Sequence, residues 1–442
     1  MNARTLISAI CMAGAVLALT AVSRPAAADT TAGAARVDIT PSLAEFPTIS
    51  LAGFGERAGK PAQSVRDDIY SRALVLSDGR TKIALVATDL IGISPGMKDA
   101  VVKKVADLGF TRNTVLLAAA HNHSAPECLH PQGDLWPLAM GKFLPAYYEF
   151  TNTRIAESIR AADAHLQPAR IGFAAAALEG FNRNRRETGG GLVDPTMTVM
   201  KVTTAAPGPA QTMALVVNFT AHPTIMGAGS FAISGEFPGA MSRSLESRMS
   251  TGGAALFFNG AQGDQTHAGP FGSGWARVDA YGKALADKAW ELAEKAEMSG
   301  NVTVGVSNLM WGLPKYRMSP AFIESTGQEY KLTPEMAMAL ASKLFPRKVR
   351  LQAVRVGDAV FMAVPGEAIT ELGLAMKRNA AGFGAGYPVI VGLANEGIGY
   401  ILSPEQYRLG SYESGTSFYG PQLGAILVSQ MNETVRPLFK GR

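Results

Sequence analysis

Short apolar runs alternate with helical patterns along most of the chain. Residues 73–77 and 82–90 are apolar or alternating and are joined by Asp78-Gly79, which predicts a β-hairpin. Residues 97–108 repeat apolar positions at helical spacing and end before a glycine. The same patterns predict strands at 114–120, 213–219, 254–258 and twice within 351–364, and helices at 147–162, 276–298, 367–378 and 422–435. This order predicts an α/β fold in which mixed β-sheets are layered with helices, and no internal repeat is evident.

The first 28 residues have the pattern of an export signal. Arg4 precedes an uncharged apolar run from residue 6 to residue 22, and Ala26-Ala27-Ala28 then offers small residues for cleavage. We expect a Sec-type signal peptide at 1–28, a single domain at 29–442, and a periplasmic or secreted protein. The alternative is a membrane anchor, although a run of about 17 residues is marginal for spanning a bilayer.

The composition narrows the classes of function. The chain has 442 residues, of which 47% are hydrophobic and 17% charged, and this excludes a disordered protein. Two cysteines exclude a small disulfide-stapled scaffold, and cleavage of the signal would leave Cys128 as the one thiol. The formal charge of +5 is thin and scattered, which argues against a nucleic-acid partner.

Histidines provide the strongest chemical signal. His121 and His123 follow one predicted strand, His222 follows a second, and His267 follows a third. Functional side chains gather at strand ends, where loops converge over a rigid scaffold. Because neutral imidazole is the commonest zinc ligand, the coincidence predicts a metal site. The alternative is that each histidine is an ordinary hydrogen-bonded residue at the end of its strand.

A catalytic zinc site also needs a further protein ligand, because the histidines supply about two of the required three or four. Three carboxylates are candidates: Asp264, Glu236 and Glu367. Glu367 directly follows an apolar strand, which makes it attractive. The residues by themselves leave the choice open.

Several motifs occur in an order that resembles the neutral (non-lysosomal) ceramidases. They are His121-x-His123-Ser124, Phe181-Asn182-Arg183-Asn184, Ala221-His222-Pro223, Gly263-Asp264, Pro365-Gly366-Glu367 and a tyrosine-rich segment from Tyr400 to Tyr419-Gly420-Pro421. The similarity spans roughly residues 33–440 in short islands.

This resemblance implies the fold of that family's N-terminal catalytic domain and one zinc ion per chain. The implied ligands are His121, His222, Glu367 and Tyr400. The implied reaction is hydrolysis of the N-acyl amide of a ceramide-like lipid, which yields a fatty acid and a sphingoid-type amine. Such a lipid substrate is compatible with transient contact with a membrane surface, and the oligomeric state stays open.

The resemblance also implies roles for residues around the ion. His123 matches an acid/base histidine, and Arg183 and Tyr412 match groups that hold the substrate near its amide. Thr266 stands where the family has a serine, so its extra methyl group would reshape the pocket.

Two further departures from the family concern a loop and the end of the chain. Pro126-Glu127-Cys128 replaces a Pro-Gly-Gly segment, so that Cys128 or His130 could touch the metal, although a packed thiol is expected. The family's C-terminal sandwich domain is expected to be absent. The alternatives are therefore hydrolysis of another acyl amide or ester, or a non-catalytic lipid-binding protein.

A serine hydrolase is a separate alternative. Gly92-Ile93-Ser94-Pro95-Gly96 fits a nucleophile-elbow pattern between a strand and a helix. The residue after the nucleophile must donate its backbone N–H to the oxyanion, and Pro95 has none. We therefore predict that Ser94-Pro95 begins the helix at Met97.

Overall fold

The structure is a computed structural model that describes residues 30–129, 141–187, 190–205, 209–249 and 252–440. The expected signal peptide and His130 lie outside these residues. Among the described residues, no helix combines the length and the apolar character needed to cross a bilayer.

Three four-stranded modules follow one another along the chain. The first contains β1 (Thr31–Asp38), β3 (Tyr70–Ser77), β4 (Lys82–Thr88) and β5 (Val115–Ala119). The second contains β6 (Gln167–Ala177), β8 (Thr196–Thr204), β9 (Thr212–Phe219) and β11 (Ala254–Asn259). The third contains β13 (Val304–Gly312), β14 (Lys348–Val356), β15 (Ala359–Ala363) and β17 (Tyr387–Val391). In each module the first three strands are antiparallel in chain order, and the fourth lies parallel to the third.

The helices repeat in the same order. A parallel strand pair needs a crossover connection, and each module has a helix between its third and fourth strands: α1 (Met97–Lys104), α4 (Glu236–Glu246) and α8 (Thr370–Gly382). A second helix follows the fourth strand: α3 (Pro145–Ala164), α5 (Gly274–Glu294) and α11 (Leu423–Val435). The fold class is confirmed as α/β with mixed sheets. The threefold repetition lies in the order and direction of the elements, which the residue pattern did not reveal.

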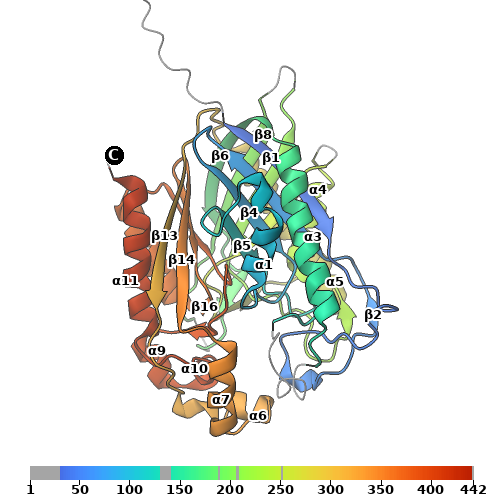
Figure 1. Cartoon of the computed structure of the whole chain (residues 1–442), viewed down its shortest axis with the longest axis vertical. Helices are drawn as coiled ribbons and strands as arrows, with labels where there is room; N and C mark the ends of the chain where they lie inside the picture. Colours follow the sequence, from blue (N-terminus) through green and yellow to red (C-terminus); the bar gives the residue numbers. More distant parts are fainter. Residues whose placement is uncertain (1–29, 130–140, 188–189, 206–208, 250–251, 441–442) are drawn as a thin grey trace, which may run out of the picture.

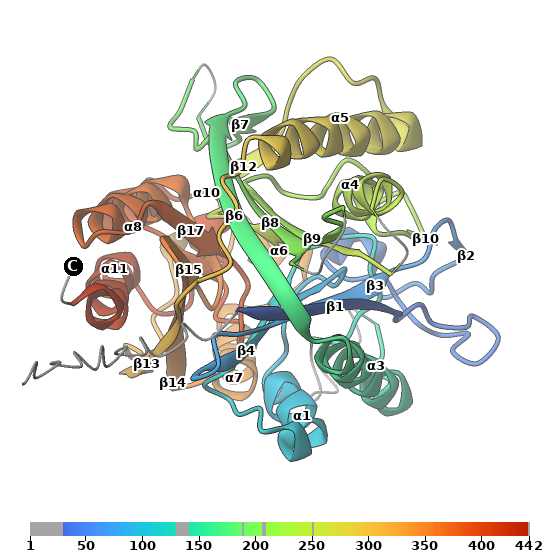
Figure 2. The ribbon, with the colours of Figure 1, turned by 90° about the horizontal axis from the view of Figure 1, so that it is seen from above.

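One apolar cluster lies where the strands of the three modules face one another. It includes Leu74, Leu85, Val216, Leu256 and Phe361, contributed by all three modules. The outer face of each module's strands is covered by that module's own helices, and Figure 2 shows the strands around a centre with helices outside. The first two modules are also continuous through β1 and β6, which pair at Thr31 and Ala32.

The connection between the first and second strands differs most among the modules. It contains β2 (Ser64–Val65) in the first module, β7 (Asn182–Asn184) in the second, and α6 (Thr326–Glu329) with α7 (Pro334–Leu344) in the third. Helices α6 and α7 gather near α9 (Pro404–Leu409) and α10 (Ser411–Gly415) at the lower end of the molecule in Figure 1. The candidate site lies toward this end.

The predicted elements agree in type and shift at their ends. The α-helix predicted at 97–108 ends at Lys104, and a 3-10 turn covers the remainder. The helix predicted at 367–378 begins only at Thr370, because Glu367 and Ala368 form the short strand β16 (Glu367–Ala368). Strands β1, β6, β8, β13 and β17 were not predicted; β6 and β13 are partly exposed and lack a clean apolar run.

Candidate metal centre

Four side chains from all three modules converge on one point. The Nε2 atoms of His121 and His222 lie 3.1 Å apart, and each lies 3.1 Å from Oε2 of Glu367. The hydroxyl of Tyr400 lies 3.4 Å from Nε2 of His222. Ligands about 2.0–2.1 Å from a tetrahedral zinc ion are about 3.3–3.4 Å from one another, so the spacing fits a single ion.

The protonation of the two rings also fits a cation. Nδ1 of His121 lies 2.8 Å from the carbonyl oxygen of Ile91, and Nδ1 of His222 lies 2.7 Å from that of Gln262. A carbonyl oxygen only accepts, so both rings carry their proton on Nδ1 and present a lone pair at Nε2. Burial, with a smaller contribution from Arg185, lowers the pKa of His222 to about 4, so this ring is neutral at pH 7.

Glu367 completes an electron-rich cluster. Its Oε2 is buried and receives no hydrogen bond from the described part of the chain. Two imidazole lone pairs and a carboxylate oxygen therefore face one another in a buried site, where like partial charges repel strongly. A divalent cation removes this repulsion, and the residues present fit one.

His121 is held in an unusual backbone conformation directly after β5. Its φ is +69°, a region that costs free energy for a residue with a side chain. Hydrogen bonds from the backbone N–H of Ala120 to Thr88 and from that of Asn122 to Leu90 hold the segment on both sides. Such strain is commonly found at functional sites, where the surrounding structure maintains it.

Asn259 links the two strand ends that carry the histidine ligands. This residue ends β11, and its side-chain amide donates to the carbonyl oxygens of Ala120, at 3.1 Å, and Ala221, at 2.8 Å. Each of these residues directly precedes a histidine of the cluster. One buried amide therefore fixes the separation of the first two modules at the site.

Glu367 and Tyr400 are direct neighbours on a small parallel ribbon. Strand β16 pairs with β18 (Tyr400–Ile401) in a register that places Glu367 opposite Tyr400. This register brings together two ligands that are far apart in sequence. The residue pattern gave no separate signal for Tyr400, which came from the family resemblance.

Arg185 is the basic residue at this cluster. Its Nη2 donates to the Tyr400 hydroxyl at 2.8 Å, and its Nε donates to Oε1 of Glu413 at 3.0 Å. Burial raises the pKa of Tyr400 well above its usual value, and the Arg185 cation opposes that shift. Arg183, which the family resemblance implied as a substrate-holding residue, is exposed on β7 and does not join the cluster. Both arginines lie in the run from 183 to 186, and only the fold distinguishes them.

His123 stands beside the four ligands. Its Nε2 lies 3.2 Å from that of His121, and the ligand atoms of His121, His123 and His222 all lie within 4.8 Å of one another. Burial, followed by the two neighbouring imidazoles, lowers the pKa of His123 well below its usual value. A Cβ at Gly53 would lie 2.3 Å from its Nδ1, and Gly53 also has a φ of +91°, so this position requires glycine. A neutral imidazole so close to the cluster can accept a proton there.

The other proposed site residues have different surroundings. Tyr412 lies with its ring centre 5.9 Å from that of Tyr400 and faces the adjacent pocket. Thr266 is buried on β12 (Gln265–His267) and forms a parallel bridge with His222. His267 meets the Arg277 guanidinium at 3.2 Å and lies outside the cluster.

The two alternative carboxylates have their own partners. Asp264 accepts hydrogen bonds from Thr370, and Glu236 accepts them from the backbone N–H groups of Ile225, Met226 and Phe237. The geometry therefore selects Glu367 from the three candidates.

The remaining alternatives are also placed by the structure. Cys128 packs in the core of the first module, where burial raises the pKa of its thiol. Helix α1 begins at Met97, three residues after Ser94, in agreement with the predicted helix start.

An apolar pocket of about 180 Å³ opens beside the cluster. His121, His123, Glu367, Tyr400 and Tyr412 border it. Its apolar walls come mainly from the first and third modules: Ile91, Ile93, Leu129, Leu344, Phe345, Leu393 and Phe418. The arrangement places reactive polar groups at the side of a space that suits a hydrocarbon chain.

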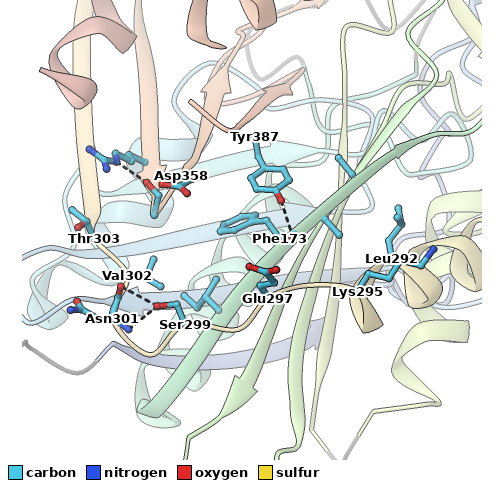
Figure 3. Close-up of a pocket in the computed structure, with 15 residues that line it drawn as sticks. Phe173, Leu292, Lys295, Glu297, Ser299, Asn301, Val302, Thr303, Asp358 and Tyr387 are labelled. Carbon is cyan, nitrogen blue, oxygen red and sulfur yellow. Dashed lines mark hydrogen bonds between the residues drawn. The ribbon is translucent and has the colours of Figure 1, made fainter. Parts of the chain in front are cut away.

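A larger hollow of about 500 Å³ lies elsewhere, between β6 and the third module. Figure 3 shows Tyr387 and Phe173 side by side in it, with Lys295, Glu297 and Asp358 around them. The Tyr387 hydroxyl donates to the backbone carbonyl of Phe173 at 3.2 Å. None of the convergent imidazoles lines this hollow, so its size alone does not indicate the reactive site.

Comparisons with known proteins bear on the family and the fold. The family described as "Neutral/alkaline non-lysosomal ceramidase, N-terminal" matches residues 31–267 and 306–428. The neutral ceramidase of Pseudomonas aeruginosa is 24% identical over 91% of this chain and 72% of its own, and that of Mycobacterium tuberculosis is 23% identical over 92% and 76%. A crystal structure of the Pseudomonas aeruginosa protein superposes with a TM-score of 0.80 at 21% identity, over 93% of this chain and 75% of that one. A structure titled "Ceramidase complexed with C2" gives a TM-score of 0.77.

Proposed function

The chain belongs to the neutral/alkaline non-lysosomal ceramidase family, and on that premise we propose that it is a zinc-dependent amidohydrolase of ceramide-like lipids. The products are a free fatty acid and a sphingoid-type amine. The observation that carries the proposal is the convergence of two imidazoles, one carboxylate and one phenol beside an apolar pocket. We also propose export to the periplasm or beyond, on the pattern of residues 1–28.

His121, His222, Glu367 and Tyr400 would hold the ion. A mixed set of nitrogen and oxygen donors at this spacing suits zinc. When bound, zinc polarises the substrate carbonyl and lowers the pKa of water toward neutrality. Arg185 favours a negative phenol oxygen on Tyr400, because its guanidinium donates to that oxygen.

The residues around the ligands would transfer the proton, stabilise the developing charge and bind the acyl chain. His123 takes a proton from the attacking water and returns it to the departing amine nitrogen, which leaves poorly without protonation. Tyr412, which borders the pocket, would donate its hydroxyl to the carbonyl oxygen as negative charge develops there. The apolar walls hold the acyl chain and keep bulk water away from the amide.

A substrate panel with measured metal content tests this function. It compares N-acyl sphingoid, N-acyl amino acid and ester substrates in wild type, His222→Ala and His267→Ala. We expect wild type to hold about one zinc per chain and to prefer the N-acyl sphingoid. His222→Ala loses zinc and activity together, whereas His267→Ala, the control outside the cluster, keeps both.

Other outcomes identify what is wrong. A preference for esters would retain the metal chemistry and replace the substrate. Bound zinc with no turnover of any substrate would favour a lipid-binding protein. A fully active wild type without metal would reject the mechanism.

A further inference from the structure

The loop from Gln262 to Gln265 contacts the surroundings of three of the four ligands. The carbonyl oxygen of Gln262 accepts from Nδ1 of His222 at 2.7 Å. The backbone N–H of Gly263 donates to the carbonyl oxygen of Ala368 at 3.0 Å, directly beside Glu367. The carbonyl oxygen of Gly263 accepts from Nη2 of Arg185 at 2.9 Å, the same nitrogen that donates to Tyr400. A displacement of this loop would therefore move His222, the Glu367 strand and Arg185 together.

The packing around the loop leaves little freedom. A Cβ on Gly263 would lie 2.7 Å from the backbone oxygen of Glu367. The backbone carbonyl of Asp264 also accepts from the backbone N–H of Arg185 at 2.8 Å. The loop thus lies between the second and third modules at the point where their ligands meet.

Asp264 anchors this loop with both of its carboxylate oxygens. Its Oδ1 accepts from the backbone N–H of Thr370 at 2.8 Å and from the Thr370 hydroxyl at 2.6 Å. Its Oδ2 accepts from Nδ2 of Asn184 at 3.1 Å. Thr370 is the first residue of α8 and follows Glu367 by three positions, while Asn184 directly precedes Arg185.

The interactions of Asp264 differ from those of a buried carboxylate held in an ion pair. It is buried, and among the described residues no lysine or arginine side chain pairs with it. Its donors are neutral groups: Thr370 and Asn184 on the two segments that carry Glu367 and Arg185, and the side-chain amide of Gln265 in the loop at 3.4 Å. Both carboxylate oxygens already accept hydrogen bonds from the protein, so Asp264 is not among the proposed ligands.

We propose that Asp264 is a positioning residue that sets the geometry of the metal centre without touching the ion. It fixes the Gln262–Gln265 loop to α8 and β7, and the loop then orients His222 and Arg185 and holds the strand of Glu367. This role rests on the proposed function only in requiring that the site hold a divalent cation.

The chain offers a matched control in Asp194. This carboxylate is also buried and also joins the second module to α8, through an ion pair with Lys377 at 2.6 Å. Its contacts do not include the Gln262–Gln265 loop. Asp194→Asn should therefore lower stability and leave the geometry of the ion unchanged.

The test compares Asp264→Asn, Thr370→Val and Asp194→Asn with wild type. Each full-length protein is loaded with Zn²⁺ or Co²⁺, and the measurements are metal affinity by chelator competition, the visible spectrum of the Co²⁺ form and the thermal midpoint. In Asp264→Asn an NH₂ group must face a donor, so we expect roughly 10–100-fold weaker metal binding and a changed Co²⁺ spectrum. Thr370→Val removes one of the three donors to Oδ1, and we expect less than about tenfold weaker binding.

The outcomes are distinct. Asp264→Asn with wild-type affinity and spectrum, and a loss of stability equal to that of Asp194→Asn, would overturn the positioning role. If Asp264→Asn does not fold, an unchanged metal affinity in Thr370→Val would overturn it instead. A wild type that binds neither ion also rejects it. If wild type binds metal, Asp264→Asn weakens that binding, and neither protein cleaves an acyl amide, the positioning role stands and the proposed hydrolysis fails.

Discussion

The first two modules and the third share one order of strands and helices, yet they supply different chemistry. His121 and His222 directly follow strands of the large sheet. Glu367 and Tyr400 come instead from the two-stranded ribbon that extends beyond the third sheet. The comparison shows that the repeated scaffold fixes where loops end, while the loops decide which atoms are presented there.

The same contrast holds for the connection between the first and second strands. In the first module this connection supplies Gly53, which lies against His123, and in the second it supplies Arg185. In the third it is largely helical and supplies Tyr330, Leu344 and Phe345 to the pocket. The connections in the first two modules thus place residues against the histidine and tyrosine of the cluster, whereas the connection in the third module lines the pocket.

The largest effect is expected when a ligand supplied by the third module is removed. Glu367→Ala removes the carboxylate that faces both histidines, and we expect loss of bound metal with a fall in kcat/KM of at least about 1000-fold. Tyr400→Phe removes the phenol oxygen and leaves the other three proposed ligands, so metal binding should weaken by roughly 10–100-fold. Metal content and steady-state kinetics measure both. Equal metal content in Glu367→Ala and wild type would show that the ligands lie elsewhere.

A smaller effect is expected for Tyr412, which belongs to the third module and is proposed to contact the substrate rather than the ion. Tyr412→Phe removes the hydroxyl of a residue that borders the pocket and is not among the four proposed ligands, so metal content should stay at the wild-type level. Loss of one donor to the developing oxyanion typically lowers kcat by about 100–1000-fold, and we expect that range with little change in KM. A fall in metal content parallel to that in kcat would instead place Tyr412 among the ligands.

The smallest expected effect concerns how stability depends on pH, and it compares a buried glutamate of the first module with one of the second. Burial raises the pKa of Glu127 and of Glu236 to about 7 in each case. Glu236 accepts three backbone N–H groups, whereas Glu127 accepts the one from Leu129, so the charged form of Glu127 is the less supported. A raised carboxyl pKa gives stability that is full below pH 4.5 and is lost as pH rises through 7.

Urea unfolding at pH 5 and pH 8 checks this sign. Wild type should lose on the order of 1–3 kcal/mol more than Glu127→Gln over that interval, because the glutamine carries no ionisable group. Glu179→Gln, at an exposed position, serves as the control and should follow wild type. An identical pH dependence in Glu127→Gln and wild type would contradict the prediction.

The sequence predicted much of this fold because the apolar runs and helical spacings are local signals. The positions of His121, His222 and Glu367 after strands were also readable, since each follows an apolar run. The choice among Glu367, Asp264 and Glu236 was not, because it depends on which carboxylate has its hydrogen bonds satisfied elsewhere.

Two features required the tertiary structure. Tyr400 becomes a neighbour of Glu367 only through the register of β16 with β18. Arg185 rather than Arg183 reaches Tyr400 only because of the way the chain leaves β7. Both depend on contacts between residues distant in sequence, which no local pattern encodes.

The assignment of the four ligands to three successive modules has a consequence for biosynthesis. Tyr400 follows the other three along the chain, so a nascent polypeptide still emerging from the ribosome lacks a complete coordination sphere. All four proposed ligands are therefore together only after the last module has docked, so we expect the tightest metal binding in the fully assembled protein rather than in a partly folded chain.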